Sequence, residues 1–135
     1  MADLTITAAN VVPGADAVLL NGTAGETITA GQAFYLEAVS QLFKLADADA
    51  VGTAAAVAIA LHGASLNQPL AGIKFGSLTL GTAVTTTAAV YVVSTTAGGI
   101  APFADLSSGD FTTVLGIATS TTALKVGIVV GGVAA

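Results

Sequence analysis

The chain has 135 residues, of which 54% are hydrophobic and only 8% are charged, and its formal net charge is −5. It contains no cysteine, which excludes disulfides and thiolate metal sites, and its three lysines stand too far apart in sequence to form a nucleic-acid-binding cluster. No apolar run reaches the about 20 residues that a membrane-spanning helix needs, so we expect neither nucleic acid nor membrane as a partner.

Short runs of alternating or β-branched apolar residues, bounded by turn residues, predict strands along the whole chain. Gly76 and Gly81 are expected to separate neighbouring strands, and Asn21-Gly22 is expected to form a tight hairpin turn. In chain order the expected strands are 4–8, 17–20, 33–37, 42–45, 57–61, 69–74, 77–80, 83–87, 88–93, 100–103, 111–118 and 123–130.

These elements define the expected fold class. Strand 42–45 should return as the partner of strand 33–37, and the segment 47–56 tolerates a short helix with Asp47 or Asp49 as its cap. Many short strands without sustained helical periodicity predict an all-β fold. We expect a compact β-barrel or sandwich of short strands, with at most one or two short helical turns.

Two parts of the chain resemble each other. The sequence AFYL at 33–36 matches AVYV at 89–92, and VAIALHGASL at 57–66 aligns with LGIATSTTAL at 115–124. This echo suggests two similar β units, residues 31–75 and 87–130, that face each other or close one barrel. Matches also arise by chance in a chain so rich in Ala, Gly, Thr and Val, so duplication stays open. We place an N-terminal strand or arm at 1–21 and the main β domain at 22–135.

No residue set predicts catalysis. His62 is the only histidine, and Ser65 lies nearby without the elbow or oxyanion loop that a hydrolase needs. Tyr35 and Tyr91 are expected at the edge of the core, with buried rings and hydroxyls at the rim. We therefore assign no catalytic and no cofactor-binding residue, and we do not expect an enzyme.

The acidic pairs are interpreted as turns. Asp47 and Asp49 resemble the opening of a calcium loop, but the further oxygen ligands and the closing Glu are lacking. Asp105 and Asp110 occupy the equivalent place in the echo, and no metal site is assigned to either pair. Asn21-Gly22-Thr23 fits a glycosylation sequon as well as a turn, and we favour the turn.

The low charge has two readings. Interface cores are depleted in Lys, Glu and Asp, so neighbouring subunits covering much of the exterior would account for the composition. A monomer coated by Thr and Ser hydroxyls is the alternative.

Three stretches resemble the small capsid decoration (cement) proteins of tailed bacteriophages, especially those of the DUF2190 type. They are AGETITAGQAFYLEAVSQLFKLADADA, AVAIALHGASLNQPLAGI and GGIAPFADLSSGDFTTVLGIATSTTALKVGI, within residues 22–128. The resemblance implies a β-barrel-like structural virion protein, often a homotrimer, that binds the major capsid protein on the outer capsid surface and stabilises the expanded head. It implies assembly in the host cytoplasm and no cofactor. The alternative is a head-fibre or adhesin-like binding module.

Overall fold

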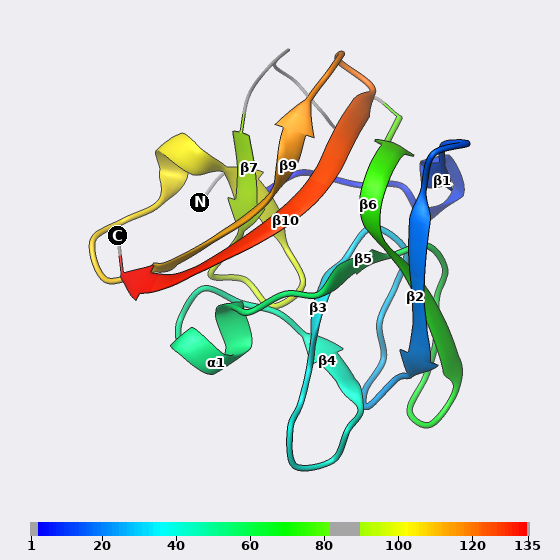
Figure 1. Ribbon diagram of the computed structural model, residues 1–135, viewed down its shortest axis with the longest axis horizontal. Helices are drawn as coiled ribbons and strands as arrows, with labels where there is room; N and C mark the ends of the chain where they lie inside the picture. The colour runs from blue at the N-terminus through cyan, green and yellow to red at the C-terminus, as the bar shows by residue number, and fades with distance from the viewer. Residues whose placement is uncertain (1–2, 82–89, 135) are drawn as a thin grey trace.

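The computed structural model of the protein, shown in Figure 1, describes residues 3–81 and 90–134. Within these ranges, a ten-stranded antiparallel sheet curls into a half-barrel, which confirms the predicted all-β class. The helical segments are the 3-10 turns η1 (Ala8–Asn10) and η2 (Phe103–Asp105) and the one-turn helix α1 (Val51–Ala54). The strands are β1 (Val12–Pro13), β2 (Val18–Thr23), β3 (Ala33–Leu36), β4 (Phe43–Leu45), β5 (Ala58–Ala60), β6 (Pro69–Thr79), β7 (Val90–Val93), β8 (Ile100–Pro102), β9 (Phe111–Ala118) and β10 (Ala123–Ala134).

Strand β6 joins the parts of the sheet. Ile73 pairs with β2 and with β5, and Phe75 pairs with β2 and with β10. A strand has only two edges, so β5 and β10 share the edge of β6 that lies opposite β2. Strand β1 lies on the same edge of β6 as β2 and pairs with Leu78 and Thr79. The sheet therefore forks at β6, as the green strand between β2 and β10 in Figure 1 shows.

The strand order is β4-β3-β5-β6-β10-β9-β7-β8. Its two halves are arranged alike, because β4-β3-β5-β6 corresponds to β8-β7-β9-β10 read from the other end. Strand β3 lies between β4 and β5, and β5 pairs with β6. Correspondingly, β7 lies between β8 and β9, and β9 pairs with β10. Two similar β units would require this arrangement. Their origin by duplication stays a prediction.

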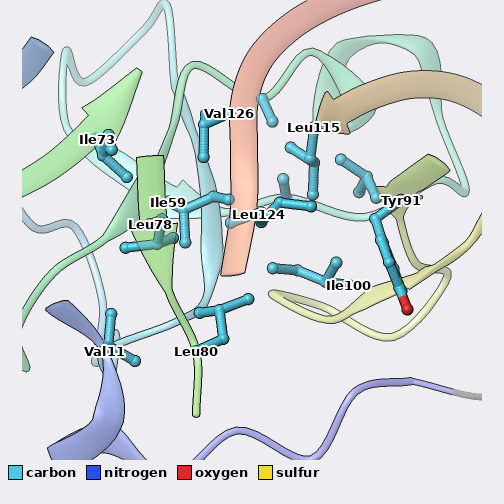
Figure 2. Close-up of a cluster of buried hydrophobic side chains, with 14 of the residues drawn as sticks. Val11, Ile59, Ile73, Leu78, Leu80, Tyr91, Ile100, Leu115, Leu124 and Val126 are labelled. Carbon is cyan, nitrogen blue, oxygen red and sulfur yellow. The ribbon is translucent and has the colours of Figure 1, made fainter. Parts of the chain in front are cut away.

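The core consists of two clusters of buried apolar side chains. The larger one lies inside the curl of β6, β7, β9 and β10 and is drawn in Figure 2. Leu4, Ile6 and Val11, which precede the first long strand, contact this same cluster. The smaller cluster is centred on Phe34 and Phe43, whose ring centroids are 4.5 Å apart. Burial of these side chains from water is the main force that holds the curled sheet together.

The prediction of a hairpin turn at Asn21-Gly22 is wrong, because both residues lie inside β2. Asn21 pairs with Ala71 and Gly22 pairs with Leu70. A Cβ atom on Gly22 would lie 2.3 Å from the ring of Phe43. Glycine is therefore needed here for close packing and not for a turn.

The expected break at Gly76 is also wrong. Gly76 has φ of +110° and lies inside β6, where it pairs with Val126 of β10. Next to it, the register between β2 and β6 shifts between Val18 and Leu19. The glycine thus bends one long strand instead of ending it, since only glycine adopts such a φ without strain.

Other elements follow the prediction more closely. Strand β9 has the expected bounds, and β4 pairs with β3 as expected. The expected strand at 4–8 is wrong: residues 4–7 belong to no strand and Ala8 begins η1, although the Leu4 N–H donates to the Ile100 carbonyl at 2.8 Å. Helix α1 lies inside the segment 47–56, but its N-cap is Ala50, which makes no side-chain cap hydrogen bond. The expected strand 83–87 lies outside the described residues.

Candidate interaction surface

The imidazole of His62 serves as a structural hydrogen-bonding group. Its Nε2 accepts the Ala71 N–H at 3.0 Å, and its Nδ1 lies 2.9 Å from the Gly63 carbonyl. The neutral ring with a proton on Nδ1 satisfies both contacts. The Ser65 N–H donates to the side-chain carbonyl of Gln68 at 2.8 Å. Both ring nitrogens are thus engaged by backbone groups, so this geometry leaves no nitrogen to act as a base toward Ser65.

The acidic residues order local turns. Asp47 Oδ1 accepts the Asp49 N–H at 3.1 Å and the Thr53 hydroxyl at 2.9 Å. Asp110 Oδ2 accepts the Ser107 N–H at 2.9 Å. In residues 3–81 and 90–134, no three His, Cys, Asp or Glu side chains gather closely enough to hold a metal ion. The turn interpretation of Asp47 is confirmed, whereas its role as a helix cap is wrong.

The two tyrosines lie in different environments. Tyr35 is half-buried on β3, and burial raises the pKa of its hydroxyl, with the nearby Glu37 carboxylate adding to the effect. Tyr91 on β7 is fully buried, and its hydroxyl has no hydrogen-bond partner among the described residues. The expectation of a hydroxyl at the rim is therefore wrong for Tyr91, because its side chain belongs to the larger core cluster, together with Ile100 and Leu115.

A small cleft lies between the N-terminal segment and two glycine-containing loops. Its volume is about 200 Å³, below the about 300 Å³ at which pockets usually begin to hold small molecules. Leu4 and Ile6 form one wall, and the loops 29–32 and 96–99 form the others. This cleft does not have the size of a substrate site.

Exposed apolar side chains gather on the outer surface of the sheet, across β2, β6, β10 and β9. Val18 lies directly opposite Phe75, and Ile117 lies opposite Lys125. The exposed fractions are 44% for Val18, 51% for Phe75 and 48% for Ile117. We call Val18, Phe75, Lys125 and Ile117 the outer face. Figure 1 shows the strands that carry it side by side.

The charges of the outer face are compensated within the chain. Lys125 Nζ lies 2.7 Å from Asp16 Oδ2 and 5.0 Å from the centroid of the Phe75 ring. The Asp16 carboxylate also accepts the Ser77 N–H at 3.0 Å. The hydrogen bond from Lys125 is the main cause that lowers the pKa of Asp16 to about 2, and the Ser77 bond adds to it. An approaching partner would meet apolar groups and a closed ion pair, with no uncompensated charge among these side chains.

The outer face lies on the back of the strands that bury the larger core cluster. Leu78, Leu124 and Val126 lie on the other side of these strands, within that cluster. This support holds the exposed apolar groups in fixed positions. Sequence analysis missed this surface, because Val18, Phe75 and Ile117 are far apart in sequence. The expected strands 69–74 and 77–80 also left Phe75 outside both.

Among known proteins, no family model matches the chain, and no curated protein matches it either. In the described part of the chain, no helix has the length and apolar character to cross a membrane.

Proposed function

We propose that this chain is a structural virion protein that binds the outer surface of a bacteriophage capsid and stabilises the expanded head. The observation that carries the proposal is the outer face, where Val18, Phe75 and Ile117 are about half exposed on a rigid sheet. The resemblance of residues 22–128 to capsid decoration proteins supports the major capsid protein as the partner.

The physical demands of decoration agree with this surface. A subunit repeated over a lattice needs only a modest contact at each position, because neighbouring contacts act at high effective concentration. Contacts that bury apolar groups avoid the cost of removing water from unpaired ions. Since Lys125 already pairs with Asp16, covering the outer face would not leave a buried charge without a partner. A homotrimer, which the resemblance implies, is part of the same proposal.

The test is co-sedimentation of the purified protein with expanded and unexpanded capsids over a salt series. We expect saturable binding to expanded shells that changes little with salt, because screening weakens ionic contacts and leaves apolar ones. Failure to sediment with either form of the shell would overturn the proposal.

A pair of variants locates the contact. Phe75→Asp places a charge in the outer face, whereas Phe103→Asp makes the same change at a residue of nearly equal exposure on η2, 52% against 51%. We expect Phe75→Asp to weaken binding to the shell by about 10-fold or more, and Phe103→Asp to leave it unchanged. Equal binding of the two variants would refute the assignment of the contact to the outer face.

A further inference from the structure

Edge strands expose unpaired backbone N–H and C=O groups, and proteins normally close or blunt such edges. Strand β4 is closed by its own chain: the Gly25 N–H donates to the Phe43 carbonyl at 2.7 Å, and the Leu45 N–H donates to Glu26 Oε2 at 2.8 Å. The edge of β8 receives the N–H of Leu4 at the Ile100 carbonyl and ends in a proline. Strand β1 has two residues, one of them proline.

Strand β2 differs from these edges. Among the described residues, the stretch Val18–Gly22 pairs with β6 alone, while the bridge between Ala24 and Phe43 places β4 beside the end of β2 on the other edge. The span Val18–Thr23 contains no charged residue and no proline, and its register is regular from Leu19 to Thr23. The distal part of β10 also lacks a second partner strand, but register shifts and Gly132 at φ +70° make it irregular.

The hydrogen bonds of Ala71 show which groups of β2 are open. Its carbonyl accepts the Leu61 N–H at 3.1 Å and its N–H donates to His62, so both groups point away from β2. In an antiparallel pair, the residue opposite such a residue also points away. The backbone groups of Asn21, and by alternation those of Leu19, are therefore directed at the open edge, while Leu20 and Gly22 face β6.

We propose that this edge pairs with the β2 edge of a second copy of the chain, in an antiparallel two-fold arrangement. The open groups call for an extended backbone, and a two-fold contact satisfies both copies at once. With Leu20 at the centre, Leu19 would exchange hydrogen bonds with the partner subunit's Asn21, and Asn21 with the partner subunit's Leu19. The paired stretch would end at Val18 and Gly22, because β4 already lies beside Ala24 on this edge.

The contact is small, so the dimer is weak. Four neutral hydrogen bonds and flanking Val18 and Leu19 side chains predict a dissociation constant on the order of 0.1–1 mM in solution. Held on a common surface, the same contact would act at high effective concentration and join neighbouring copies. The pairing does not depend on the proposed function, because it follows from the edge alone.

Amide hydrogen exchange measured by NMR tests the pairing residue by residue. At about 20 µM, the amides of Leu19 and Asn21 should exchange fast and those of Leu20 and Gly22 slowly, and at about 2 mM exchange at Leu19 and Asn21 should slow several-fold. Exchange at Leu20 and Gly22 should not change with concentration. Fast exchange of the Leu19 and Asn21 amides at both concentrations would overturn the proposal. This holds even if the protein forms trimers through another surface.

Two lysine variants separate the edge from general charge effects. Asn21→Lys places a charge beside the open edge, a common device against strand pairing, while Thr121→Lys makes the same charge change at an exposed turn residue. We expect sedimentation velocity to show, for the wild type and Thr121→Lys, association at millimolar concentration beyond the state present at micromolar concentration, and no such increase for Asn21→Lys. An increase that survives Asn21→Lys would refute β2 pairing. Capsid binding by Phe75→Asp is a separate measurement, so either proposal can fail without affecting the test of the other.

Discussion

Tyr91→Phe is expected to stabilise the protein. The Tyr91 side chain is fully buried, and its hydroxyl has no hydrogen-bond partner among the described residues. Figure 2 shows the ring at one side of the drawn cluster, with the hydroxyl oxygen at the end away from Leu115. Folding therefore strips water from this hydroxyl, no described residue supplies a hydrogen bond in return, and removing the oxygen removes that cost.

The magnitude follows from two opposing effects. A buried hydroxyl without a partner costs about 1–3 kcal/mol, while deleting one oxygen forfeits a few atom contacts worth about 0.1–0.2 kcal/mol each. We therefore expect Tyr91→Phe to raise the free energy of unfolding by about 1–2 kcal/mol. For a chain of this length, each kcal/mol corresponds to a rise in Tm of about 3–5 °C.

Urea denaturation followed by circular dichroism measures this change. The midpoint should rise while the m-value stays constant, because the surface exposed on unfolding is unchanged. Tyr35→Phe is the matched control: Tyr35 is partly exposed, so its loss of a hydroxyl should change stability by less than about 0.5 kcal/mol. A loss of about 1 kcal/mol or more in Tyr91→Phe would refute the reasoning, because it would mean that the hydroxyl makes a stabilising bond.

Two further predictions concern stability. A Cβ at Gly72 would lie 2.5 Å from Phe34 Cζ, whereas one at Gly52 meets nothing within 4 Å. In the same denaturation assay, Gly72→Ala should therefore lower the free energy of unfolding by about 1–3 kcal/mol, and Gly52→Ala in α1 should raise it by about 0.5–1 kcal/mol. Changes of the same sign in the two variants would contradict this account of close packing. Because the folded pKa of Asp16 is about 2, below its usual 3.8, its stabilising contribution should be complete above about pH 4 and disappear as pH falls toward 2. The stability difference between wild type and Asp16→Asn, measured from pH 6 to 2, should shrink over that window, and a constant difference would contradict the Lys125 ion pair.

Part of the candidate surface was accessible to sequence analysis and part was not. The low charge of the chain, which is a property of its composition, indicated an exterior suited to contact with other subunits. Which side chains form the outer face depends on the pairing of β6 with β2 and β10, whose residues lie more than 40 positions away in sequence. The open edge of β2 was hidden for the same reason, since only the bonds of Ala71 show where the groups of Asn21 point.

Local sequence determined the all-β class, the bounds of β9 and the pairing of β3 with β4 across a short turn. These features depend on side-chain alternation and on contacts between residues close in the chain. The tertiary structure alone decided the roles of Gly22 and Gly76. Both glycines look like turn residues, yet the long-range partners of β2 and β6 keep them in strands, one making room for the Phe43 ring and one bending β6. Hydrogen bonds to a distant strand outweigh local turn preference, and no local pattern contains that information.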